Sequence, residues 1–519
     1  APVYENTDSE TTFNWTIDGK SICTASTLTF SADEAGRYFI LISATNAGGT
    51  TEKEIRIDVF QLDIPTISIA DADKGFKVLQ GSELTITPIV DSFLETCYSW
   101  QINGEDISNE LTCTLPTIEL GEYQVRFATH NEDGDDEVTF KVEVCSPDQV
   151  DFNWTFLQTE YNMSAGRTIR IKPVDVNNAL DAVYTWTVDN EQVQSGEIDT
   201  YLFSSEQQGE LTVKVEMKNS YILATQTLKV NVCPPAGTYQ RKISATSSAS
   251  MNRVYEYLPA PGQFINENHT TTTMAEACTY AEERINQTAY VSLGGFGGYI
   301  IVGFDHSIVN DGDYNIAITG NAFDGSSEPG IVWVMQYENG DRLPNDTWYE
   351  LRGSEYGKAE TWQDYAVTYH KPTGIQLPTP WTDNHGQSGS IDYLGAFHRQ
   401  DYYYPAWVKE KQYTLRGTRL KERNYDQSGN GTYWVNDSYE WGYADNFSAI
   451  DRLTDDDNYN AGPSDNHFKI SHAVTFDGKD ANLKYIDFIK VQVGVNSKSG
   501  WLGEISTEVF GIKDFNMLK

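Results

Sequence analysis

Aromatic side chains are concentrated in one stretch of the second half of the chain. Residues 397–447 contain thirteen phenylalanine, tyrosine and tryptophan residues, including three consecutive tyrosines at 402–404. Because a strand buries alternate residues, three consecutive tyrosines in a strand cannot all face one core, and we expect at least one at the surface unless a loop or another domain covers it. The rings either fill a large sandwich or form a platform for a planar or ring-shaped ligand.

Polar loops near these aromatics have the residue types that would hold the edge of such a ligand. They lie at 381–389, 426–431 and 458–462 and are rich in Asn, Asp, Gln and Gly. The same residues are what tight turns require, so these loops are either ligand contacts or plain turns. The candidate ligand contacts are Trp381, Asp383, Asn384, Tyr402, Tyr403, Tyr404, Trp407, Trp434 and Trp441.

A second segment, 338–350, has oxygen-bearing side chains around a central glycine. Ca²⁺ takes six to eight oxygen ligands on a sharply turning backbone, so this spacing would suit a calcium loop. Tyr337 stands where an opening Asp would be expected, and Arg342 places a cation in the loop, so a plain turn is the stronger interpretation. No cofactor is required, and calcium is the one cofactor that the sequence indicates. The candidate ligands are Glu338, Asn339, Asp341, Asn345 and Asp346.

Motifs of the common enzyme classes are missing from the sequence. It has no GxSxG, HExxH or Walker loop, and no GxGxxG that opens a helix after a strand. His385, His398, His467 and His472 do not have a metal-ligand spacing. Pairs such as Asp346 with Glu350, and the run 455–457, would supply the carboxylates of a glycosidase, but in so acidic a chain they are better interpreted as solvated loops. We predict that the protein is not an enzyme.

Charge excludes one class of partner. Asp and Glu number 75 against 37 Lys and Arg, which gives a net charge of −38 and a field that repels nucleic acid and anionic lipid. A hydrophobic content of 39% indicates a globular chain. No apolar run approaches the roughly 18 residues of a bilayer-spanning helix. The chain opens on Ala1-Pro2-Val3, so we expect that any export signal or lipid anchor has been removed.

Six cysteines are few for 519 residues, and no CxxC pair occurs. We expect mostly buried free thiols with one or two bridges. Cys97 and Cys113 lie in one repeat and are the best candidates for a bridge.

An internal repeat organises the first half. Trp15, Trp100 and Trp186 recur at intervals of 85 and 86 residues, each ahead of an Asp-Gly, Asn-Gly or Asp-Asn turn. Glycines at 36, 121 and 209 and asparagines at 46, 131 and 219 keep nearly the same period. Short alternating strands with a core tryptophan at this period predict immunoglobulin-like sandwiches.

These motifs resemble the PKD-like family of bacterial surface proteins over residues 1–234. The third copy departs from the family at 210–212 and 218–220. We predict sandwiches at 1–60, which begins inside its fold, at 61–146 and at 147–234. Such modules are usually spacers rather than binding domains, and their tryptophans are expected in the core.

The remaining residues, 235–519, follow a Pro-Pro-Ala-Gly boundary and hold eight of the twelve tryptophans. Residues 273–285 predict one short helix with Thr273 as its N-cap. The other segments alternate between turns, which predicts a larger β-sandwich of jelly-roll type. The whole chain is therefore expected to be all-β.

From about Gly262 onward the chain resembles the carboxy-terminal domain of surface lipoproteins from gut Bacteroidetes. The segments 261–267, 302–307, 328–334, 401–407, 416–420, 440–446 and 499–504 carry the resemblance. It implies a lipid-anchored protein on the outer-membrane surface, with PKD-like spacers and a binding domain. It also implies capture of a corrinoid such as vitamin B12 for a TonB-dependent transporter.

Two other functions remain open. Tyr and Trp also stack on sugars, with Asp and Asn pairing to hydroxyls, so a glycan is the alternative ligand. A structural or adhesive stalk without a small ligand would keep these aromatics buried.

Overall fold

The computed structural model describes residues 2–33, 36–59, 62–70, 72–92, 94–146, 152–177, 179, 181–219, 222–453 and 462–519. The acidic run 455–457 and most of the loop 458–462 therefore lie outside the described residues, as do residues 60, 61 and 147 at the predicted domain limits. The fold is all-β, as predicted, and these residues contain one α-helix. No helix among the described residues is long and apolar enough to cross a membrane.

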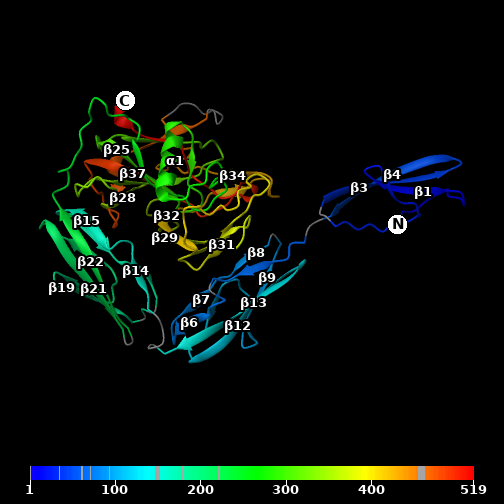
Figure 1. The fold of residues 1–519 in the computed structure, drawn as a ribbon, viewed down its shortest axis with the longest axis horizontal. Coiled ribbons are helices and arrows are strands. Elements are labelled where there is room, and N and C mark those ends of the chain that lie inside the picture. Colours follow the sequence, from blue (N-terminus) through cyan, green and yellow to red (C-terminus); the bar gives the residue numbers. More distant parts are fainter. Residues whose placement is uncertain are drawn as a thin grey trace.

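The first three units (Figure 1) share an order of four strands, to which the second and third units add a fifth strand and two strand pairs. The first has the sheet order β2-β1-β3-β4, made of β1 (Thr12–Ile17), β2 (Lys20–Cys23), β3 (Gly36–Asn46) and β4 (Gly49–Val59). The second has the order β10-β9-β12-β13-β6 with the pairs β11-β7 and β5-β8. The third has the order β15-β22-β21-β18-β19 with the pairs β16-β20 and β14-β17.

The strands of the second unit are β5 (Thr66–Ser68), β6 (Phe76–Leu79), β7 (Leu84–Ile86), β8 (Ile89–Asp91), β9 (Cys97–Ile102), β10 (Glu105–Ser108), β11 (Cys113–Leu115), β12 (Gly121–Asn131) and β13 (Gly134–Cys145). Those of the third are β14 (Trp154–Phe156), β15 (Glu160–Ser164), β16 (Thr168–Ile171), β17 (Pro173–Val176), β18 (Val183–Val188), β19 (Glu191–Gly196), β20 (Tyr201–Ser204), β21 (Gly209–Lys218) and β22 (Leu223–Cys233).

The three repeated tryptophans occupy the same place in each unit. Trp15, Trp100 and Trp186 lie on β1, β9 and β18 and are at most 3% exposed. The turn that follows each one has two residues with positive φ, for example 49° and 74° at Asp18 and Gly19. Two positive φ values define the type I′ turn that matches strand twist, so this turn sets the hairpin register behind each core tryptophan. The prediction that these tryptophans are core residues is confirmed.

The expected bridge between Cys97 and Cys113 is wrong, because all six cysteines are free. Cys97 opens β9 in the five-stranded sheet and is exposed, whereas Cys113 is buried on β11 in a two-stranded sheet. Sharing a repeat does not bring two residues together when they lie in different sheets of the sandwich.

The carboxy-terminal domain is a larger β-sandwich. Its sheets have the orders β23-β25-β37-β27-β28-β36, β31-β30-β29-β32, β35-β26-β39, β24-β38 and β33-β34. The predicted helix is present as α1 (Met274–Asn286), and its N-cap Thr273 accepts a hydrogen bond from the Glu276 amide at 3.2 Å. Helix α1 packs on β23 and contributes Ala277, Ala281 and Ile285 to the core.

The strands of this domain are β23 (Arg253–Leu258), β24 (Val291–Ser292), β25 (Tyr299–Val309), β26 (Ile316–Gly320), β27 (Gly330–Met335), β28 (Trp348–Leu351), β29 (Trp362–His370), β30 (Thr379–Asp383), β31 (Ser388–Ile391), β32 (Gln412–Arg419), β33 (Asn424–Asp426), β34 (Trp434–Asn436), β35 (Ser464–Phe468), β36 (Ala473–Val474), β37 (Tyr485–Val493), β38 (Glu508–Val509) and β39 (Gly511–Asp514). Three short 3-10 helices are η2 (Ile470–His472), η3 (Gly500–Leu502) and η4 (Phe515–Met517).

The second and third sandwiches fold back against this domain, and the first projects away from it (Figure 1). On β31, the Ser388 hydroxyl donates to the Pro88 carbonyl next to β8 at 2.8 Å. From the third sandwich, Arg167 donates to the Ala481 carbonyl at 3.0 Å and lies 3.3 Å from the Glu338 carboxylate. Side chains of the first sheet bond within their own sandwich, where the Trp15 indole donates to the Ala25 carbonyl at 2.9 Å and the Asn46 amide donates to the Asn6 carbonyl at 3.2 Å.

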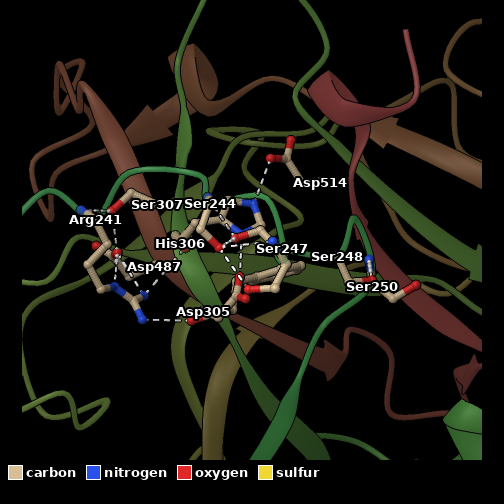
Figure 2. Close-up of polar contacts among 12 residues, drawn as sticks. Arg241, Ser244, Ser247, Ser248, Ser250, Asp305, His306, Ser307, Asp487 and Asp514 are labelled. Atoms are coloured by element: carbon tan, nitrogen blue, oxygen red, sulfur yellow. Dashed lines mark hydrogen bonds and ion pairs between the residues drawn. The ribbon is translucent and has the colours of Figure 1, made fainter.

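A buried polar cluster fixes the segment that leaves the third sandwich (Figure 2). Arg241 donates to the Asp487 carboxylate at 2.9 Å and to the Phe304 carbonyl at 2.7 Å. The Ser307 hydroxyl donates to the same carboxylate at 2.6 Å. This cluster holds the connecting segment against β25 and β37, so the third sandwich meets the carboxy-terminal domain in a defined orientation.

Candidate functional site

A large open cleft separates the third sandwich from the carboxy-terminal domain. Its volume is about 670 Å³, within the range of small-ligand sites. One wall comes from β16 and β17 of the third sandwich, and the other comes from β27, β28, β32 and β37. Ion pairs span the two walls, with Arg170 and Lys172 both bound to Asp364 at 3.0 and 2.8 Å.

The inner wall of the cleft contains a row of side chains set by strand register. Lys490 on β37 pairs with Trp333 on β27, and Trp333 pairs with Glu350 on β28. Directly paired residues point to the same face of a sheet, so all three side chains face the cleft. Their neighbours along each strand, such as Val332 and Val334, point into the core on the other face.

Charge and burial make this row unusual. The Lys490 ammonium lies 4.7 Å from the Tyr299 ring centre and 5.6 Å from that of Trp333. Burial lowers the pKa of Lys490 to about 8, and burial raises the pKa of Glu350 to about 7. None of the ion pairs among the described residues includes either one. The Glu350 carboxylate accepts a hydrogen bond from the Thr418 hydroxyl at 2.5 Å.

In one pocket, Trp333 supplies a ring face, Lys490 a cation, and Glu350 a carboxyl group that can form hydrogen bonds. The buried indole Nε1 of Trp333 has no hydrogen-bond partner within the described part of the chain. A ligand with an apolar face, an acceptor and a negative charge would match these three features.

A second feature is an aromatic patch on the carboxy-terminal domain, made of the exposed Phe397, Tyr425, Tyr433 and Trp501 and the half-buried Trp434. Phe397 and Tyr433 are 64% and 60% exposed, and the Phe397 and Trp501 ring centres lie 6.3 Å apart. The Trp501 indole donates to the Thr432 carbonyl at 3.4 Å, which joins η3 to the loop between β33 and β34. Asp426 shapes that loop by accepting hydrogen bonds from the amides of residues 428 and 431.

The nine predicted ligand contacts do not form one platform. Asn384 lines the cleft, Trp434 belongs to the aromatic patch, and Trp407 and Trp441 line two smaller pockets. Trp381 is half-buried, and the Asp383 carboxylate accepts a hydrogen bond from the Tyr365 hydroxyl at 2.6 Å.

The three consecutive tyrosines are mostly internal. Tyr403 and Tyr404 are each 1% exposed, and Tyr402 is half-buried with Lys371 5.7 Å from its ring centre. Residues 401–409 form an irregular segment rather than a strand, so the alternation between core and surface does not apply to them. Tyr403 and Tyr404 therefore pack inside the domain and present no ring face to solvent.

The predicted calcium residues are divided between two environments. Asn339, Asp341 and Asn345 form an exposed hydrogen-bonded turn, with distances of 2.7 to 2.9 Å between their side chains. Glu338 and Asp346 are buried at the contact with the third sandwich, where Glu338 faces Arg167. Burial raises the pKa of Asp346 to about 7.

A histidine, His306, lies beside several serines, which are residue types of a catalytic centre (Figure 2). The two ring nitrogens of His306 lie 2.7 Å from Asp305 and 2.9 Å from Asp514. Both nitrogens thus face carboxylates, so neither is available to take a proton from a serine hydroxyl.

Comparisons with known proteins agree with the amino-terminal architecture. The PKD-like domain family matches residues 1–46, 64–131 and 136–219, so the amino-terminal part of the chain contains PKD-like domains. No curated protein matches the chain.

Solved structures similar to this chain are tandem immunoglobulin-like or fibronectin-like modules. The fibronectin(III)-like modules of Clostridium thermocellum CbhA are 15% identical over 34% of this chain and 100% of that one, with a TM-score of 0.18. Three domains of the bacteriophage RB49 outer capsid protein Hoc are 15% identical over 44% and 90%, with a TM-score of 0.20. Titin I67–I69 is 13% identical over 43% and 88%, with a TM-score of 0.18. These scores are too low to carry an argument about function.

Proposed function

We propose that this chain is a non-catalytic binding protein in which PKD-like modules support a ligand-binding carboxy-terminal domain. Tandem immunoglobulin-like modules are consistent with a structural or adhesive stalk. The observation that supports ligand binding is the row of Lys490, Trp333 and Glu350 on one face of a sheet, because its ammonium faces a 670 Å³ cleft without an ion-pair partner. Lys490 is half-buried, and the charge of Glu256 offsets only part of the cost of burying its ammonium, so an anionic ligand in the cleft would stabilise it further.

A corrinoid is the leading ligand in this proposal. Its macrocycle is apolar on both faces, amides surround the edge, and cobalamins carry one phosphodiester charge, which would match the ring, the polar walls and Lys490. The resemblance of the carboxy-terminal domain to corrinoid-capturing surface lipoproteins supports the same ligand. We also propose that an amino-terminal lipid anchor holds the protein at the outer membrane, and that the protein passes the ligand to a TonB-dependent transporter.

A glycan is the second candidate, and the aromatic patch is the feature that favours it. Exposed contiguous aromatic surface marks an interaction site, and open ring faces suit the apolar faces of sugars. The two functions therefore predict different binding surfaces on the same domain.

Calorimetric titration of the full chain tests both. One arm uses cyanocobalamin and the other uses a panel of soluble glycans. In the cobalamin arm, Lys490→Met is expected to weaken binding by about tenfold or more, since charge-assisted bonds contribute about 1.5–3 kcal/mol. Lys371→Met is the matched control, because Lys371 also lies over aromatic rings but outside the cleft.

The outcomes separate the hypotheses. Cobalamin binding that Lys490→Met weakens and Lys371→Met leaves unchanged supports corrinoid capture in the cleft. Glycan binding that Trp501→Ala abolishes supports the aromatic patch instead. No heat in either arm leaves the structural stalk as the function and refutes ligand capture.

A further inference from the structure

Three acidic side chains from distant parts of the carboxy-terminal domain meet at one point. Glu328 precedes β27, Asp445 follows β34, and Glu508 opens β38. One oxygen from each lies within 4.8 Å of the others. Asp445 is fully buried, Glu508 is 3% exposed, and Glu328 is partly exposed.

The surrounding protein does not neutralise these three charges. None of the ion pairs among the described residues contains Glu328, Asp445 or Glu508. Three like charges this close, shielded from water, are unfavourable without a proton or a cation between them.

Glu508 provides an independent sign of a missing ligand. Its Oε1 atom is buried and has no hydrogen-bond partner in the described part of the chain. A buried acceptor without a partner is rare in proteins and requires an explanation. The oxygen belongs to one of the three converging carboxylates, so a ligand at their centre would satisfy it.

Asp445 is held rigidly, as a metal ligand would be. Its Oδ1 accepts hydrogen bonds from the amides of Asn321 and Ala322 at 2.7 and 2.8 Å, and its Oδ2 accepts one from the Glu508 amide at 2.9 Å. The Asn321 side-chain amide, turned so that its nitrogen faces Asp445, adds a hydrogen bond of 3.1 Å to Oδ1 and one of 3.3 Å to Oδ2. Backbone amides thus fix the carboxylate before any cation arrives.

We propose that Glu328, Asp445 and Glu508 together bind one divalent cation, Ca²⁺. Two oxygens bound to the same Ca²⁺, each about 2.4 Å from it, lie no more than about 4.8 Å apart, and these three oxygens meet that limit. An all-oxygen set without His or Cys favours Ca²⁺ over Zn²⁺. This site is separate from the loop 338–346 and does not depend on the ligand proposed for the cleft.

The cation would tie together chain segments that otherwise meet through a few backbone bonds. The Glu328 amide donates to the Asp445 carbonyl at 2.9 Å, and the Gly330 and Ala444 backbones pair with each other. The loop that ends at Glu328 also pairs with Asn436 on β34, next to Trp434 of the aromatic patch. Cation binding is therefore expected to stabilise this side of the domain.

The test is calorimetric titration of the EDTA-treated full chain with CaCl₂, together with thermal unfolding with and without Ca²⁺. We expect saturable binding and a higher Tm in Ca²⁺. Glu508→Gln is expected to weaken Ca²⁺ binding by more than about tenfold, since it removes a charged ligand. Asp341→Asn, in the exposed turn of the other acidic segment, is the matched control and should bind Ca²⁺ like the wild type.

Thermal unfolding in EDTA checks that the Glu508→Gln variant is folded. Without Ca²⁺, its Tm should equal or exceed that of the wild type, because the substitution removes one of three carboxylates that repel each other. If it does not fold, Glu328→Gln replaces it, because Glu328 is partly exposed. No saturable Ca²⁺ binding by the wild type would overturn the proposal in favour of a proton shared among the carboxylates. Binding lost in Asp341→Asn but retained in the glutamate variants would overturn it in favour of the 338–346 turn.

Discussion

Replacing Glu350 with Gln should remove a pH-dependent part of the stability of the carboxy-terminal domain. Glu350 is 6% exposed, and burial raises its pKa from 4.5 to about 7. The folded state therefore binds a proton at Glu350 more tightly than the unfolded state does. The contribution of protonated Glu350 to the stability of the folded state is fully present below about pH 4.5 and is lost as the pH rises through 7.

The size of the effect follows from the two pKa values. One pKa unit corresponds to about 1.4 kcal/mol, so the interval from 4.5 to about 7 corresponds to about 3 kcal/mol. Most of this contribution to the free energy of unfolding is lost as the pH rises from 5 to 8. Gln keeps the shape of the side chain and can still accept from the Thr418 hydroxyl, so Glu350→Gln should flatten the pH profile by about 2–3 kcal/mol.

Urea unfolding at pH 5 and pH 8, followed by tryptophan fluorescence, measures the difference. Eight of the twelve tryptophans lie in residues 235–519, so the signal reports mainly on this domain. Glu360→Gln is the control, because Glu360 is fully exposed and its ion pair with Lys421 lowers its pKa. Parallel pH profiles for the wild type and Glu350→Gln would refute the assignment of a raised pKa to Glu350.

Two further predictions concern the sandwiches and their contacts. Trp100→Phe should destabilise its sandwich by about 1 kcal/mol more than Trp186→Phe does. The Trp100 indole donates to a carbonyl at 2.9 Å, whereas the Trp186 indole has no partner among the described residues. Hydrogen exchange measures the stability of each sandwich, and equal losses of stability in the two variants would contradict the prediction. Arg167→Met should cost about 3–5 kcal/mol by leaving Glu338 buried without a cation. Protease cleavage of the third sandwich should accelerate in that variant, and Arg170→Met, at a more exposed pair, should change it far less.

Local patterns were sufficient to predict most of the fold. The tryptophan period marked equivalent core positions in three sandwiches, because Trp15, Trp100 and Trp186 each precede a turn that fixes hairpin register. Thr273 marked the start of the helix, because an N-cap hydroxyl satisfies an otherwise free amide of the first turn. Both signals act over a few residues, so they can be read without knowing the tertiary structure.

The candidate site could not be predicted in the same way. Lys490 stands out in an apolar strand, and Trp333 and Glu350 each stand between core residues, which is a usable signal for each strand separately. Their alignment depends on the strand order β37-β27-β28, in which β37 pairs with a strand more than a hundred residues earlier in the chain. The sequence left open whether the aromatic cluster fills the core or forms a platform, because alternation along a strand does not apply to Tyr403 and Tyr404, which lie in an irregular segment that buries consecutive residues.

The return of the second and third sandwiches to the carboxy-terminal domain also sets how far the protein can reach. Three modules in an extended line would act as a long tether, with each linker adding freedom of movement. Here the contacts at Ser388 and Arg167 hold two of them against the carboxy-terminal domain that lines the cleft, whereas the first sandwich projects away from it (Figure 1). The second and third modules therefore add rigidity rather than length, and of the three modules only the first extends the reach of the body that contains the cleft.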